Sequence, residues 1–354
     1  MRQLWFPALV MLIAVGFPVA ARAETWQEQS THDVPAAGIR SLEVENARGL
    51  VSVKRANRPW IHLEALKIVR SNDSHWARRV SRETQVVAEN HGGEYTVHVV
   101  YPQRQTVRIM FWDLLSGFEL PRVEVRLALE VPDGIALTLR TTSGDLTSTD
   151  VRSPQLLEST SGDVSVSGAS SVRVVCTSGD VSLFDTGAAQ IRSVSGDLVA
   201  ERPRGPLSAE TTSGDVRVRR AADSLEASTE SGDIEVDAAP KGVHAGTTSG
   251  GIDVRRASGR IRLESASGDI GLGLSAPLER ADVSTSSGDV EVKLPRTLGC
   301  ALDLGSSNGD IHAEVPLSVE NVTRHKLTGI VRRGTAPLVV RTASGDINVS
   351  EAAP

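Results

Sequence analysis

A carboxylate that directly follows a glycine recurs through the C-terminal two thirds of the chain, and it is the only repeated group with chemical potential. Stacked carboxylates a few ångströms apart repel one another, so turn N–H groups, solvent or cations must offset their charge. The recurrence therefore has two interpretations, a turn stabilised by each side chain or a row of cation sites. The aspartates are Asp145, Asp163, Asp180, Asp197, Asp215, Asp233, Asp269, Asp289, Asp310 and Asp346.

Calcium is the cation to consider, because calcium-binding β-rolls also have coils of about 18 residues. Those coils carry a nonapeptide of the type G-G-x-G-x-D-x-U-x twice per coil. This chain has one Gly-Asp pair per unit and lacks the glycine pairs. The pattern favours aspartates that stabilise repeated turns, with no metal and no cofactor.

Residues for other chemistry are scattered. The histidines have no metal-ligand spacing, and no nucleophile elbow is present. The clear break in the aspartate pattern is Gly251, which removes a functional group instead of adding one. We therefore predict that the protein is not an enzyme. The alternative is a carbohydrate-active β-helix enzyme that uses surface carboxylates.

The aspartates belong to a Ser-Gly-Asp repeat, and its near-constant period defines the elements that position them. Gly250 and Gly309 keep the glycine slot in units with altered neighbours. The spacing is 17 to 21 residues, followed by one interval of 36 residues, which is two periods. The other repeat glycines are Gly144, Gly162, Gly179, Gly196, Gly214, Gly232, Gly268, Gly288 and Gly345.

Each repeat unit predicts two short strands joined at Ser-Gly-Asp. Aliphatic residues stand two and four positions after the glycine, as in Val164 and Val166, and five and seven positions before it, as in Val172 and Val174. Both pairs have the period of a strand with one buried face. We predict an all-β fold, a parallel β-solenoid (β-helix) of about 18-residue coils, in which stacked coils bury a continuous core.

Two further columns explain how such a core is filled. The residue three before each glycine is always small, as in Ser159, Cys176 and Thr211, which predicts a narrow interior. The residue directly before the glycine is serine in nearly every unit, and these hydroxyls are expected to satisfy turn backbone groups. Outward positions alternate in charge, as in Arg217 and Glu235, and we expect register-keeping ion pairs there.

The N-terminal third differs from the repeat. Residues 1–23 predict a cleavable signal peptide, with an apolar run after Arg2 and the cleavage signal Ala21-Arg22-Ala23. Residues 24–130 predict a β-rich capping region with a short helix between Ser71 and Arg82 and a hairpin around 90–93. Residues 131–354 form the Ser-Gly-Asp repeat. Within its long final interval, Val319 to Val331 is expected to be an elaborated coil or a cap.

The segment 107–120 is the most apolar part of the chain after the signal. One interpretation is a helix or strand that packs over the end of the solenoid. The other is an exposed contact with a partner or a peripheral contact with a membrane surface. The candidate contact residues are Phe111, Trp112, Leu115 and Phe118.

Charge and cysteine content restrict the partners and the compartment. The net charge of −6 argues against nucleic acid as a partner. We expect no transmembrane span after signal cleavage, and a periplasmic or secreted protein. The repeat register places Cys176 and Cys300 roughly 30 Å apart, too far for a disulfide, so we predict two unpaired thiols.

The units Thr177 to Leu183, Thr212 to Val218 and Ser286 to Val292, of the form Thr-Ser-Gly-Asp-Val-x-Val, resemble the bacterial putative-adhesin β-strand-repeat family, domain of unknown function 4097. The resemblance covers most of the chain and implies an exported β-repeat protein without catalytic residues. We therefore expect a non-catalytic cell-envelope module, adhesin-like or a periplasmic scaffold, whose partner is an unknown envelope protein or glycan. A self-assembling β-helix is the further alternative.

Overall fold

The computed structural model describes residues 24–71, 74–102 and 122–352. The predicted all-β class is confirmed, because the described strands form one hydrogen-bonded sheet and the single helix of this part is α1 (Ser74–Glu83). The predicted signal segment 1–23 and the four candidate contact residues Phe111, Trp112, Leu115 and Phe118 lie outside the described residues.

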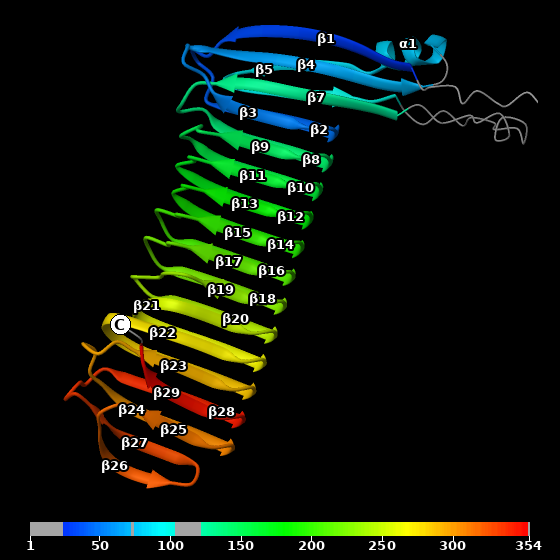
Figure 1. Cartoon of the computed structure of the whole chain (residues 1–354). Coiled ribbons are helices and arrows are strands. Elements are labelled where there is room, and N and C mark those ends of the chain that lie inside the picture. Colours follow the sequence, from blue (N-terminus) through cyan, green and yellow to red (C-terminus); the bar gives the residue numbers. More distant parts are fainter. Residues whose placement is uncertain (1–23, 72–73, 103–121, 353–354) are drawn as a thin grey trace, which may run out of the picture.

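The repeat units form stacked rungs, each made of a long strand, a Ser-Gly-Asp turn and a short strand (Figure 1). The strand β21 (Ile252–Ser267) and the strand β22 (Ile270–Ser287) each join the short strand of one rung to the long strand of the next. The other long strands are β2 (Ser41–Arg48), β8 (Ala136–Ser143), β10 (Pro154–Ser161), β12 (Ser171–Ser178), β14 (Ala188–Ser195), β16 (Leu207–Ser213), β18 (Leu225–Ser231), β20 (Val243–Ser249), β24 (Cys300–Asn308) and β28 (Pro337–Ser344). The other short strands are β3 (Val51–Arg55), β9 (Leu146–Thr149), β11 (Val164–Ser167), β13 (Val181–Phe184), β15 (Leu198–Glu201), β17 (Val216–Arg219), β19 (Ile234–Val236), β23 (Val290–Leu294), β25 (Ile311–Glu314) and β29 (Ile347–Glu351).

Neighbouring rungs pair in parallel and in register. Long strands pair with long strands, and short strands with short strands, so that equivalent residues face each other. Val164 stands opposite Val181, for example, and Val216 opposite Ile234. We call the two resulting stacks the long-strand ladder and the short-strand ladder.

The core lies between the two ladders. Alternate residues of each strand point inward, so Leu157, Val164 and Ile191 are almost completely buried. The small column three before the glycine, as in Thr211 and Ser265, is also buried. Each fully buried Val, Leu or Ile stabilises the fold by roughly 1.5–3 kcal/mol, and a short aliphatic strand cannot obtain this burial without a neighbouring rung.

At the N-terminal end the rungs do not follow chain order. The rung β2/β3 pairs on one side with β8/β9 and on the other with β6 (Glu94–Val100) and β7 (Arg122–Val131). Three antiparallel strands lie beyond these. The strand β5 (Gln85–His91) forms a hairpin with β6, while β4 (Trp60–Ser71) pairs with β7, and β1 (Glu24–Pro35) pairs with β4. The helix α1 contacts β4 and β1 and buries Ala77 and Val80.

The C-terminal end also departs from the expected order. The sequence spacing suggested that rungs stack as they follow in the chain, but the last rung, β28/β29, lies between β22/β23 and β24/β25. The interval 315–336 contains β26 (Leu317–Thr323) and β27 (Lys326–Val331), a hairpin that extends the long-strand ladder beyond β24. Within the final interval the chain therefore runs to the end of the stack and then returns to place β28 between β22 and β24.

Candidate functional site

The turn column is built around backbone contact between glycines. A Cβ added to Gly214 would lie 2.1 Å from the carbonyl oxygen of Gly196, and Gly232 stands in the same relation to Gly214. Gly214 also has a φ of +138°, a conformation that disfavours other residues. Gly49 joins the column, because Gly144 lies against its carbonyl group. The repeat requires glycine for this close approach.

The aspartate column forms a hydrogen-bonded ladder along the same edge. Asp180 Oδ1 accepts a hydrogen bond from the backbone N–H of Asp197 at 2.9 Å, and Asp163 Oδ1 accepts from the N–H of Asp180 at 3.0 Å. The same contact joins Asp233 to the N–H of Gly251. Each carboxylate thus binds the turn of an adjacent rung, which is the turn-stabilising interpretation of the pattern. In the part of the chain that the structure describes, no group of three or more Asp, Glu, His or Cys residues could hold a metal ion.

Hydroxyls three before the glycine bind the turn from inside. Thr229 Oγ1 donates to the carbonyl oxygen of Gly214 at 3.3 Å, and Thr247 and Ser265 make the equivalent bond to their neighbouring glycines. The hydroxyl predicted from the sequence to satisfy turn backbone groups was that of the serine directly before the glycine. That serine, for example Ser213, instead accepts through its backbone carbonyl a hydrogen bond from the glycine N–H of the preceding rung, here Gly196.

The two cysteines are unpaired, as predicted, and both are buried. Burial raises the pKa of the Cys300 thiol to about 11. Burial also raises the pKa of Cys176, whose sulfur lies 3.8 Å from the carbonyl oxygen of Gly179. Neither thiol is therefore a thiolate at neutral pH, and neither resembles a catalytic nucleophile.

The outward charges on the short-strand ladder pair across rungs. Arg217 lies 2.6 Å from Asp215 and 3.2 Å from Asp197, and it also approaches Glu235. Arg255 binds Asp253, Glu235 and Asp237 in the same manner. These groups are substantially exposed, so each pair stabilises the register only modestly.

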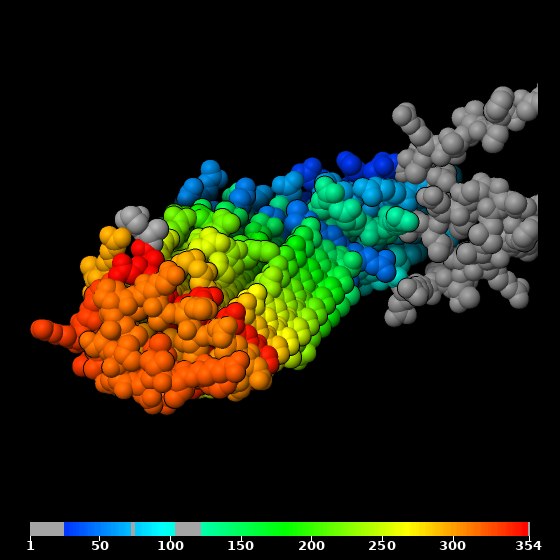
Figure 2. Space-filling view, turned by 60° about the horizontal axis from the view of Figure 1, so that its bottom comes forward, coloured from blue at the N-terminus to red at the C-terminus, as the bar shows by residue number. Residues whose placement is uncertain are grey.

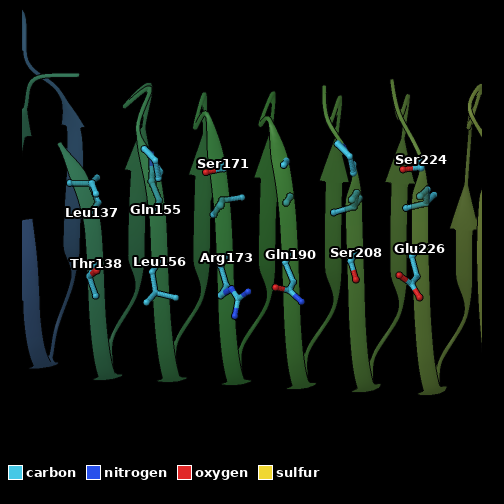
Figure 3. Close-up of a pocket in the computed structure, with 18 of the residues that line it drawn as sticks. Leu137, Thr138, Gln155, Leu156, Ser171, Arg173, Gln190, Ser208, Ser224 and Glu226 are labelled. Atoms are coloured by element: carbon cyan, nitrogen blue, oxygen red, sulfur yellow. The ribbon is translucent and has the colours of Figure 1, made fainter. Parts of the chain in front are cut away.

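A groove lies on the long-strand ladder, at the starts of the strands (Figure 3). Its volume is about 950 Å³, and its lining extends across β8, β10, β12, β14, β16 and β18 to His244 of β20. Figure 2 shows the side chains of the stack as parallel rows along this rod-shaped part of the molecule. We call this hollow the long-strand groove. Its side chains include Thr138, Leu156, Arg173, Gln190, Ser208 and Glu226.

The residues of this groove are not among the predicted site residues. They occupy outward positions of the long strands, where no repeated residue type marks a site. A usable signal was the residue eight positions before the repeat glycine, which is small or proline in six successive rungs: Ala136, Pro154, Ser171, Ala188, Pro206 and Ser224. Small side chains at this position leave a depression in the surface of the ladder, between the larger side chains on either side.

A second hollow, of about 580 Å³, lies on the short-strand side where Gly251 and Gly271 lack side chains. Its walls carry Asp233, Asp253 and Glu291 together with Arg255. Because Arg255 is already bound to neighbouring carboxylates, the hollow is an acidic surface without a free cationic group among its lining residues.

No helix in the described ranges is both long and apolar enough to cross a membrane. A search of curated proteins gave no match. Among solved structures, the chain is similar to a putative cell adhesion protein from Clostridium sporogenes, with 7% identity, a TM-score of 0.23, and coverage of 92% of this chain and 100% of that chain.

Two further structures come from Parabacteroides distasonis. A putative lipid binding protein has 10% identity and a TM-score of 0.30, covering 92% of this chain and 97% of that chain. A putative adhesin has 9% identity and a TM-score of 0.26, covering 91% and 97%. The model of the family described as Toastrack DUF4097 matches residues 133–246 and 241–350, which together include nearly all the rungs from β8/β9 onward. The chain therefore belongs to the Toastrack DUF4097 family.

Proposed function

We propose that this protein is a non-catalytic cell-envelope module that binds an elongated glycan along the long-strand groove. In this proposal the stacked rungs act as a β-solenoid scaffold, a stiff support whose strands hold the binding side chains at fixed spacing. Membership of a β-repeat family and the adhesin-type names of the similar structures agree with a binding role.

The observation that carries the proposal is the length and lining of the groove. Its lining spans seven successive long strands, from β8 to β20, a distance of roughly 29 Å at the spacing of strands in a sheet. Hydroxyl, amide, guanidinium and carboxylate groups alternate along it, at Thr138, Arg173, Gln190, Ser208 and Glu226. Such groups can form hydrogen bonds with sugar hydroxyls, because the rungs present polar side chains at this position, except for the rung of β10, which presents Leu156.

The same lining is the reason to propose binding without cleavage. Glycoside hydrolysis uses a pair of carboxyl groups that flank the scissile bond, about 5–9.5 Å apart. Glu226 is the single carboxylate among the residues that line the groove. A carbohydrate-active enzyme would require a second one facing it.

We further propose that the chain is exported and acts in the periplasm or outside the cell. The apolar run and the signal Ala21-Arg22-Ala23 support this proposal. Protein recovered from the periplasm is expected to begin at Glu24. Recovery of the uncleaved chain in the cytoplasm would contradict it.

The binding proposal is tested on an array of immobilised glycans with the purified protein and two variants. The double variant Arg173→Ala/Gln190→Ala removes two polar groups from the groove and should reduce retention about tenfold or more. The matched control is Arg219→Ala, an exposed arginine on the short-strand side, which should leave retention unchanged. Release of shortened products would support the enzyme instead, and equal retention of both variants would exclude the groove.

A further inference from the structure

The C-terminal end of the stack is stepped, because its two ladders stop at different levels. The long-strand ladder continues past β24 with the antiparallel strands β27 and β26 (Figure 1). The short-strand ladder stops at β25, which pairs only with β29 within the described residues. The hairpin therefore extends two strands beyond the last short strand.

The inner face of this hairpin is apolar and uncovered. Strand pairing aligns Leu317, Val319 and Val322 through β27 with the inward-facing residues of β24, so they lie on the core side of the ladder. Because no short strand among the described residues stands opposite, Val319 is 56% exposed and Val322 is 60% exposed. They are the two most exposed large hydrophobic side chains in the described part of the chain.

The step also has two open strand edges. The outer edge of β25 and the outer edge of β26 have no strand partner among the described residues. Half-buried core residues stand behind the first edge, including Ile311 and Ala313. An unpaired edge beside an uncovered apolar face is a surface that accepts another strand.

We infer that this step is the docking surface for a second copy of the same chain, in a two-fold symmetric, end-to-end dimer that goes beyond the proposed glycan binding. The axis runs parallel to the strands, midway between the ladders. It places the hairpin of each copy over the short-strand end of the other. The stepped ends of the two copies are then complementary in shape, and β26 of each copy pairs with β25 of the other copy.

Strand direction fits this arrangement. The strands β24 and β25 run in opposite directions, because one Ser-Asn-Gly-Asp turn joins them, and β26 runs in the direction of β24, because both are antiparallel to β27. The two-fold axis preserves strand direction. The strand β26 therefore meets β25 of the second copy as an antiparallel pair, which a sheet edge readily accepts.

The side chains are complementary in the register that aligns the apolar positions. With Val319 opposite Ala313 of the second copy, Leu317 stands opposite Val315, and Glu320 stands beside His312. The β-bulge between Val319 and Asn321 then brings Val322 to Ile311. The pairing thus joins apolar residues on the inner face and an acidic with a basic side chain on the outer face. This match within one sequence identifies the occupant as a second copy.

Sedimentation velocity across a concentration range tests the dimer, with protein purified from cells that express the full chain. Each copy contributes the 4 residues of β25 and the 7 residues of β26, fewer than the roughly 20–30 residues of a standard interface, so the dimer should form in the micromolar range. The variant Val319→Asp/Val322→Asp should raise the dissociation constant about 100-fold or more. The matched control Val194→Asp changes a valine that is 50% exposed on the long-strand ladder and should dimerise normally.

A cross-link distinguishes this register from other contacts. The double variant His312→Cys/Glu320→Cys should form a disulfide-linked dimer under mild oxidation, and each single variant should not. Because both side chains are exposed, these changes should leave the fold intact. A wild-type protein that stays monomeric at all concentrations, open-ended filaments in place of a closed dimer, or a dimer insensitive to Val319→Asp/Val322→Asp would overturn the inference.

Discussion

At the scale of single residues, each repeat position has one physical task. Glycine permits the close approach of backbones, as between Gly214 and Gly196, and the next residue hydrogen-bonds the adjacent turn through its carboxylate. A small hydroxyl residue such as Thr229 binds a glycine carbonyl from the inside. These tasks were predictable in part, because the residue types allow few alternatives at a 17- or 18-residue spacing.

The glycine column should be intolerant of even one methyl group. Gly214→Ala would place Cβ 2.1 Å from the Gly196 carbonyl oxygen in a conformation that L-residues rarely adopt, so we expect a loss of about 3 kcal/mol or more. Gly246→Ala is the matched control, because its Cβ would meet no atom closer than 3.9 Å. Urea unfolding measures both. Equal stability of the two variants would contradict the close-approach account.

The buried thiol of Cys300 should make stability depend on alkaline pH. Burial raises its pKa from 9.0 to about 11. Between these values the unfolded chain has lost the proton while the folded chain keeps it, so stability is intact below pH 9 and falls as the pH rises towards 11. The loss from this group is on the order of 3 kcal/mol at most. Denaturant unfolding at pH 8 to 11 should show a smaller decline for Cys300→Ala, and an identical decline would contradict this assignment.

At the scale of elements, the rungs are interchangeable, and this limits what the sequence can predict. The strand positions of Val164, Leu157 and their equivalents followed from the period of two on each side of the glycine. The order of the rungs at the two ends did not follow, because every rung presents the same columns to its neighbours. Nothing in the spacing states that β2/β3 and β28/β29 lie inside the stack.

Placing the last rung inside the stack should protect it. The strand β28 has a partner on both sides, β22 and β24, whereas β26 pairs on one side only. In protein diluted below the dissociation constant of the proposed dimer, we expect the amide hydrogens of β28 to exchange more slowly than those of β26, although β28 is nearer to the C-terminus. Native-state hydrogen exchange by mass spectrometry resolves the two peptides. Faster exchange in β28 would show that the last rung is a frayed end.

At the scale of the whole molecule, the stack holds its outward side chains at regular intervals. Its rungs repeat at the spacing of strands, so outward side chains form straight columns, and the long-strand groove is one consequence of that regularity. The groove could not be predicted from the repeat alone, because the outward residues Leu156, Arg173 and Glu226 share no type. The columns, the groove and the stepped end all depend on one claim, that successive rungs lie directly beside each other in the order found here.

Distances between spin labels test that claim most directly. With one label at Ser165 and a second at the equivalent position of another rung, the separation should be about 24 Å to Asp253, about 38 Å to Asn348 and about 43 Å to His312. The account predicts that Asn348 lies nearer to Ser165 than His312 does, although it comes later in the chain. The distances are measured by pulsed electron–electron double resonance. A shorter distance from Ser165 to His312 than to Asn348, or distances that do not increase with rung number, would contradict the account.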